Sequence, residues 1–293
     1  MRKYDFATVD VFTTERFGGN QLAVFIDAAG LTDVDMQSLA AEMNYSETTF
    51  VLPPKDPANT AHVRIFNRTA EMPFAGHPNV GTAFVLARLR PELGDMLQFE
   101  EMAGLVSVRV TRADSEPTGA EIDAPQPLQL LGELEPADVA KCIGLMPDDI
   151  RVETHRPIRA TVGVEFVLVE VAPDKLSEVA PDLTAFREVA AKHGRGRRLS
   201  LFIYAHDGDA VRARMFAPLA GTWEDPATGS ASATLGALLL HHSDANELAI
   251  DISQGVEMGR PSALKVKARR APDGIRASVG GTCVPIFRGS IEM

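Results

Sequence analysis

The sequence predicts an α+β protein made of two similar halves, and its length, an internal repeat and a recurring order of elements support this prediction. The 293 residues are about enough for two domains, since globular domains usually contain ~100–200 residues. The repeat is faint, but residues 40–44 match 190–194 and residues 64–66 match 214–216 at the same spacing. In both halves a strand leads through a loop into a helix rich in small residues. We therefore expect a duplicated architecture.

The first half is predicted to span residues 1–126. Its elements, in order, are a strand at 22–26, a helix at 32–43 that Thr32 caps, strands at 49–52 and 61–66, a loop at 71–78 and a helix at 80–86. The last of these helices is rich in small residues that allow close packing, so we expect its N-terminus to be buried.

The second half is predicted to span residues 127–293 and to repeat this scheme. Its elements are a strand at 166–169 before a helical stretch, a strand at 212–216, a loop at 223–230 and a helix at 231–240. Turn residues between 116 and 127 place the boundary near 124–130. The final strand can cross back to the first half.

Composition and charge disfavour some classes of binding partner. The 40 acidic and 29 basic residues give a formal net charge of -11, which disfavours binding to nucleic acid or anionic lipid. No apolar run approaches the ~18 residues that span a bilayer, and Asp5 and Asp10 interrupt any N-terminal signal core. The only cysteines, Cys142 and Cys283, exclude a framework of several disulfides, so we expect a cytoplasmic protein.

Two predicted helix starts are candidate ligand sites. A helix N-terminus presents unpaired N–H groups and about half a positive charge, so it can bind a carboxylate or phosphate even on an acidic protein. Gly76–His77 and Gly229–Ser230 stand at such starts, and pseudo-symmetric halves would turn both toward one cleft for a small anionic ligand. Alternatively, the glycines only allow tight turns, Ser230 is a helix cap and His77 is a turn residue.

Two carboxylates are candidates for chemistry. Glu47 lies in a polar stretch between a helix and an apolar strand, where burial would tune it for acid–base work; the alternative is a solvated turn residue. Asp225 precedes Pro226, which biases its backbone toward an extended form. Asp225 either holds His77 or caps the following helix, and the sequence leaves both open.

The remaining motifs are weaker candidates for a functional site. His241 and His242 are adjacent at a helix end and point about 100° apart, which is poor geometry for one shared metal. The basic run from Arg195 to Arg198 either contacts an anion or lies in a solvated loop. No dinucleotide-binding, Walker or nucleophile-elbow motif occurs in a suitable context, so we predict neither a cofactor nor a metal.

Five segments form a pattern that is specific when they are taken together. They are residues 17–25, 42–50, 64–66 with 71–78, 224–231 and 254–261. With these segments the chain resembles the PhzF-like isomerases of phenazine biosynthesis, which share the diaminopimelate epimerase-like fold. The resemblance spans almost the whole chain. It implies two pseudo-symmetric domains, each with a curved sheet or barrel around a central helix, and a homodimer.

The resemblance also implies roles for individual residues. Glu47 takes the place of the family's acid–base carboxylate, and His77 and Asp225 take those of its polar partners. The residues matching ligand-binding positions are Ser46, Gly76, Gly229 and Ser230. Asn67–Arg68 departs from the Thr-Pro that family members often have, which puts substrate choice in doubt.

Amino-acid epimerases and racemases of the same fold use two opposed cysteines at these helix starts. Here Ala75 and Ala227 stand at about those positions, and the two cysteines lie elsewhere. Two-base chemistry through thiolates therefore lacks its acid–base pair, while proton transfer by a single carboxylate remains possible.

The resulting prediction is a cofactor-independent isomerase that moves a proton within a small anionic or cyclic carboxylate. Glu47 would remove and return the proton, His77 held by Asp225 would polarise a heteroatom, and the helix starts would fix a carboxylate. The resembled enzyme acts on trans-2,3-dihydro-3-hydroxyanthranilate. The alternatives are a non-catalytic binder of small carboxylates, an epimerase-like enzyme on another substrate, and a metal-dependent hydrolase centred on His77.

Overall fold

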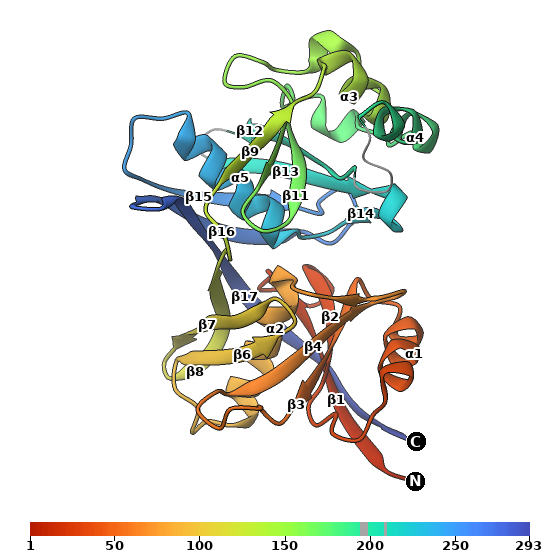
Figure 1. Cartoon of the computed structure of the whole chain (residues 1–293), viewed down its shortest axis with the longest axis vertical. Coiled ribbons are helices and arrows are strands. Elements are labelled where there is room, and N and C mark those ends of the chain that lie inside the picture. The colour runs from red at the N-terminus through yellow and green to blue at the C-terminus, as the bar shows by residue number, and fades with distance from the viewer. Residues whose placement is uncertain (194–198, 208–209) are drawn as a thin grey trace. The chain divides into compact units, whose positions relative to one another are not determined.

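The computed structural model describes residues 1–193, 199–207 and 210–293 and divides them into two compact units (Figure 1). Unit 1 comprises residues 1–123 and 280–293, and unit 2 comprises residues 124–279. The C-terminal residues thus belong with the first half of the chain. The basic run from Arg195 to Arg198 lies outside the described residues.

Unit 1 is a ring of strands with one helix inside it and one outside (Figure 1). Its strands are β1 (Lys3–Val11), β2 (Asn20–Phe25), β3 (Glu47–Leu52), β4 (Ala61–Asn67), β5 (Glu71–Met72), β6 (Met96–Glu101), β7 (Gly104–Ala113), β8 (Glu116–Asp123) and the end of β17 (Gly274–Glu292). The outer helix is α1 (Asp33–Met43) and the inner one is α2 (Gly76–Leu89). The ring closes because β17 pairs with both β1 and β8.

Small residues allow α2 to occupy the inside of this ring. Its residues 76–87 are all buried. A Cβ built on Gly81 would lie 2.5 Å from the Leu22 side chain and 2.8 Å from that of Val11, so this position requires glycine for close approach. The buried hydroxyls of Thr82 and Thr49 satisfy each other at 2.8 Å.

Unit 2 has its own strands and helices. Its strands are β9 (Gln129–Glu133), β10 (Ile158–Thr161), β11 (Glu165–Glu170), β12 (Leu201–Asp207), β13 (Ala210–Ala217), β14 (Thr222–Asp225), β15 (Glu247–Gln254), β16 (Ser262–Ala271) and the start of β17. Its α-helices are α3 (Pro136–Ile143), α4 (Leu183–Lys192) and α5 (Gly229–His241), and its short 3-10 turns are Pro147–Asp149, Leu176–Glu178 and Pro218–Ala220. Within the described parts of the chain, no helix has the length and apolar character needed to cross a membrane.

The strand pairing confirms that the two halves are duplicates. In unit 1, β2 pairs parallel with β3, β3 antiparallel with β4, and β4 parallel with β6. In unit 2 the same pattern links β11 to β12, β12 to β13, and β13 to β15. The helices α2 and α5 follow at equivalent points of each unit and are both almost entirely buried.

The repeated Arg-x-Phe segments make equivalent contacts in the two units. Arg64 donates to both Glu71 carboxylate oxygens at 2.7 Å and lies over the Phe66 ring at 5.1 Å. Arg214 donates to both Glu224 oxygens at 2.8 and 3.0 Å, and lies 4.9 Å from the Phe216 ring centroid. This bidentate pairing fixes the strand that leads toward α2 in unit 1 and toward α5 in unit 2.

Three predicted element starts at the candidate site were wrong. The strand predicted at 49–52 begins at Glu47, and the helices predicted at 80 and 231 begin at Gly76 and Gly229. Glycine and proline suggested a loop, but proline is tolerated in a first helical turn because its missing N–H would have no intrahelical partner there. Thr32 caps α1 as predicted, accepting from the Asp35 N–H.

Candidate active site

Glu47 lies beside His77 within unit 1. Glu47 is the first residue of β3, and His77 is the second residue of α2. Their atoms Oε2 and Nε2 are 3.5 Å apart, and the two side chains are 18% and 6% exposed. The chain reaches β3 because α1 ends at Met43 and its C-cap Asn44, with a left-handed backbone (φ 55°), turns the chain away from the helix. The structure thus brings together the proposed base and one predicted partner.

His77 is a neutral imidazole. Burial lowers the pKa of His77 to about 3, and a hydrogen bond to the Gln21 backbone opposes this shift only in part. The contact with Glu47 is therefore not a salt bridge at neutral pH. Because Nε2 makes no hydrogen bond to any described residue, the bond to the Gln21 carbonyl falls to Nδ1, which donates. Nε2 then presents a lone pair toward the Glu47 carboxyl group.

We expect His77 to make the protein less stable in acid. Its pKa of about 3 in the folded chain is below the value of 6.5 for a free histidine, so the unfolded chain takes up a proton first as pH falls. The contribution of neutral His77 to the free energy of unfolding is fully present above pH ~6.5 and is lost as the pH falls toward ~3. Between pH ~6.5 and ~4.5 we expect a loss of about 2–3 kcal/mol.

Urea unfolding at those two pH values measures the loss. His77→Gln should remove this part of the pH dependence, while His241→Gln, a change at an exposed histidine, should leave it as in the wild type. An unchanged pH dependence in His77→Gln would contradict the assignment of a neutral, buried imidazole.

The start of α2 offers free backbone donors. Its N-cap residue is Ala75, which has no side-chain oxygen, and no described side chain caps the helix. The first turn has no acidic residue. N–H groups at such a helix start suit an oxyanion. Nearby, the Ser46 hydroxyl donates to Asn20 Oδ1 at 3.2 Å and so orders the residue before Glu47.

In unit 2, Asp225 belongs to a buried network at the start of α5. The Thr228 hydroxyl donates to Asp225 Oδ2 at 2.6 Å. Gln254 Nε2 donates to the Asp225 carbonyl at 2.7 Å, and Gln254 Oε1 accepts from the Thr228 N–H at 3.0 Å. Gln254 therefore holds the loop that carries Asp225 in place. This role of Gln254 was not predicted from the sequence, although Gln254 opens one of the segments that carry the family resemblance.

The structure decides between some alternatives for unit 2 and leaves others open. The N-cap of α5 is Thr228, so neither Asp225 nor Ser230 caps this helix. Gly229 and Ser230 are its first two residues, and Thr228 directs its hydroxyl to Asp225 instead of the helix N–H groups. That Asp225 holds His77, and that both helix starts serve one ligand, stay predictions.

The two cysteines lie away from both helix starts. Cys142 is on α3 and Cys283 is on β17, and both are buried free thiols. Burial raises the pKa of Cys142 to about 12 and also raises the pKa of Cys283. Both are therefore thiols at neutral pH, which makes thiolate chemistry at these residues unfavourable.

The paired histidines are at the end of a helix, as predicted. α5 ends at His241, and His242 is its C-cap. Their rings are nearly perpendicular, with centroids 5.0 Å apart. Among the residues that the structure describes, no group of three or more His, Cys, Asp or Glu side chains is placed to hold a metal ion.

Comparison with known proteins identifies the class of fold and then the family. A hydroxyproline epimerase of Agrobacterium vitis superposes with a TM-score of 0.65 at 14% identity, covering 99% of this chain and 91% of its own. The fold is therefore the diaminopimelate epimerase-like α+β fold, as predicted. The family described as phenazine biosynthesis-like protein (PhzC-PhzF) matches residues 9–289, and the chain belongs to it.

Individual relatives cover nearly the full length. An uncharacterized isomerase of Mesorhizobium japonicum is 38% identical, with 99% of both chains covered. The trans-2,3-dihydro-3-hydroxyanthranilate isomerase of Pseudomonas fluorescens is 35% identical and covers 99% of this chain and 100% of its own. The PhzF-family phenazine biosynthesis protein of Bacillus anthracis has a TM-score of 0.88 at 25% identity over the whole of both chains. These relatives support membership in a family of isomerases.

Proposed function

We propose that this protein is a cofactor-independent isomerase in which Glu47 moves a proton within a small substrate that carries a carboxylate. The observation that supports this most is the position of Glu47 Oε2, 3.5 Å from the lone-pair nitrogen of a neutral, buried histidine. A carboxyl group beside a hydrogen-bond acceptor can hold a proton and release it again, which is the requirement for acid–base catalysis.

In the proposed reaction, Glu47 first acts as a base. A substrate C–H bond next to an unsaturated group breaks, its proton goes to Glu47, and the electron pair stays on the substrate, spread over the unsaturated system. Glu47 then returns the proton to a different carbon, so that the double bonds shift and no net charge is gained or lost. His77 Nε2 accepts a hydrogen bond from the protonated Glu47 between the two steps.

Substrate binding is assigned to the uncapped helix starts. The N–H groups at Gly76, and those at Gly229 and Ser230, can hold a carboxylate or the negative charge that develops when the proton leaves. The absence of acidic residues from the first turn of both helices favours this use.

Substrate choice depends on the turn beside Glu47. Asn67 lies opposite Glu47 in the β3–β4 pairing, and its Oδ1 accepts from the N–H groups of Thr69 and Ala70 at 2.8 Å. This turn contains the Asn67–Arg68 pair that departs from the family pattern. We therefore place trans-2,3-dihydro-3-hydroxyanthranilate first in a panel of candidate substrates that also includes other cyclic and amino-substituted carboxylates.

The experiment is to incubate the protein with each compound of this panel and to analyse the products by chromatography and mass spectrometry. The proposal predicts at least one product of unchanged mass, formed without added cofactor. Saturable binding with no turnover of any bound compound would instead support a non-catalytic carboxylate binder.

A further inference from the structure

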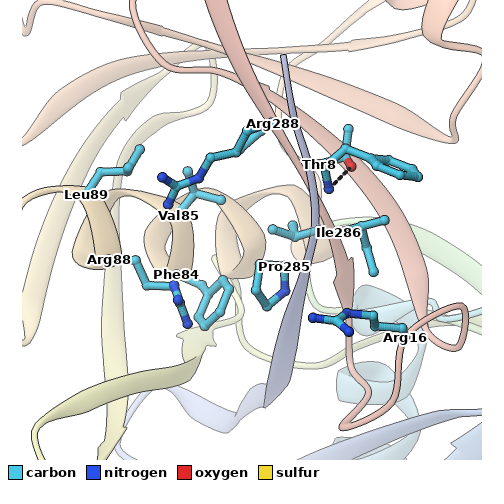
Figure 2. A pocket seen from close by; sticks show the side chains of 12 residues that line it. Thr8, Arg16, Phe84, Val85, Arg88, Leu89, Pro285, Ile286 and Arg288 are labelled. Carbon is cyan, nitrogen blue, oxygen red and sulfur yellow. Dashed lines mark hydrogen bonds between the residues drawn. The ribbon is translucent and has the colours of Figure 1, made fainter.

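Unit 1 contains a pocket that the proposed chemistry does not use (Figure 2). Its volume is about 310 Å³. It lies between the C-terminal half of α2, the middle of β1 and the end of β17, with one side chain from the loop after β1. Apolar groups form much of its wall, including Phe84, Val85, Leu89, Pro285 and Ile286.

Three arginines line this pocket. They are Arg16, Arg88 and Arg288, from three separate parts of the chain (Figure 2). None of them forms an ion pair with a carboxylate of any residue that the structure describes, although the protein carries a formal net charge of -11. All three residues are exposed, so water can solvate each of them singly. Their convergence on one apolar wall is what favours an anionic ligand.

The position of Arg88 is partly explained by its contacts within α2. It stands in the last turn of α2, where a positive charge stabilises the helix, and its guanidinium lies 5.5 Å from the Phe84 ring centroid. This contact also orients Arg88 along the pocket wall, as Figure 2 shows. Neither the helix end nor the aromatic contact accounts for Arg16 and Arg288.

An irregularity in the sheet opens the pocket on the β17 side. The β1–β17 pairing shifts register between Thr8 and Val9, which leaves Ile286 without a partner residue. Pro285 has no N–H to donate, and the N–H of Phe287 bonds to the Thr8 hydroxyl at 3.1 Å instead of a backbone carbonyl. Phe287, which follows this bulge and also lines the pocket, is 60% exposed.

We propose that this pocket binds a small organic anion: a carboxylate attached to an apolar ring. The volume is at the lower end of the ~300–1,000 Å³ typical of small-molecule sites, so it suits a ring and not a nucleotide. Phe84, Val85 and Pro285 contact the ring, while the planar guanidinium groups match the two oxygens of a carboxylate. The site is separate from Glu47 and His77 and does not depend on the proposed function.

The test uses 1-naphthoate as the probe, measured by equilibrium dialysis against the full-length protein. We expect saturable binding that weakens ~10-fold or more in the Arg88→Gln/Arg288→Gln variant, because charge-assisted hydrogen bonds are lost. The neutral 1-naphthylmethanol should bind ~10-fold or more weakly than 1-naphthoate. The matched control is Arg109→Gln, an exposed arginine on β7 outside the pocket, which should bind like the wild type.

Two further measurements locate the bound ligand and determine whether the pocket is a subunit interface. Anomalous diffraction from bound 4-bromo-1-naphthoate should place the bromine against Phe84 and Pro285. Absence of saturable binding, binding that persists unchanged in the double variant, or a bromine located only beside Glu47 would overturn the proposal. A dimer of the wild type that the double variant dissociates in sedimentation velocity would also overturn it, since the pocket would then be a subunit interface.

Discussion

Glu47→Gln should lower the rate of isomerisation by about 10²–10⁴-fold while substrate affinity changes only a few-fold. The amide keeps the shape and hydrogen-bonding capacity of the side chain beside His77, but it cannot take up a proton from carbon. The loss should therefore appear in kcat and not in the dissociation constant. Steady-state kinetics and calorimetric binding of the same substrate measure the two quantities separately.

A matched control distinguishes this role from a general effect of lost charge. Glu42 is exposed on α1, only a few residues from Glu47, so Glu42→Gln should keep the wild-type rate. A Glu47→Gln variant that retains more than about a tenth of the rate would remove Glu47 from the role of proton carrier.

Arg214→Met should lower the free energy of unfolding by about 3–5 kcal/mol. Arg214 is buried, pairs with Glu224 through two hydrogen bonds, and also donates to the Leu176 and Val179 carbonyls at 3.2 and 2.7 Å. Its removal leaves the Glu224 carboxylate buried without its charged partner. Urea denaturation measures the loss.

The repeat supplies the matched control for this change. Arg64 makes the same pairing with Glu71, but both side chains are more exposed, at 18% and 23% against 9% and 11% for the Arg214–Glu224 pair. Water can solvate the partner that is left, so Arg64→Met should cost roughly 1–2 kcal/mol. The double variant Arg214→Met/Glu224→Met should recover part of the loss, because no unpaired charge remains. Equal losses at the two sites would contradict the dependence on burial.

The duplication was predictable because it leaves a trace in the sequence. The matching residues 64–66 and 214–216 place an arginine and a phenylalanine on the same face of equivalent strands, and the structure pairs both arginines with a glutamate in the same way. Their acidic partners were not predicted, because they lie on short strands, β5 and β14, that have too few residues for a periodic pattern. The return of the last strand to unit 1 depends on long-range pairing with β1.

Local motifs identified single residues of the candidate site, but they did not predict the contacts between distant segments. Glu47 and His77 were singled out from separate segments, and the structure places them together because β3 runs alongside the inner helix. The neutral state of His77 could not be predicted, since it results from burial by residues that are distant in sequence. The role of Gln254 was missed for the same reason, because its partners Asp225 and Thr228 belong to a different element.

In the proposed reaction a single carboxyl group, that of Glu47, carries hydrogen from one carbon of the substrate to another. Mass spectrometry of substrate and product recovered from deuterated buffer tests this transfer, with wild type and Glu47→Gln at saturating substrate. The wild type should introduce solvent deuterium at one carbon, because Glu47 is 18% exposed and a proton that it holds can exchange with solvent before it is returned. Glu47→Gln, with substrate bound, should introduce none. Deuterium incorporation at the wild-type rate by Glu47→Gln would contradict it.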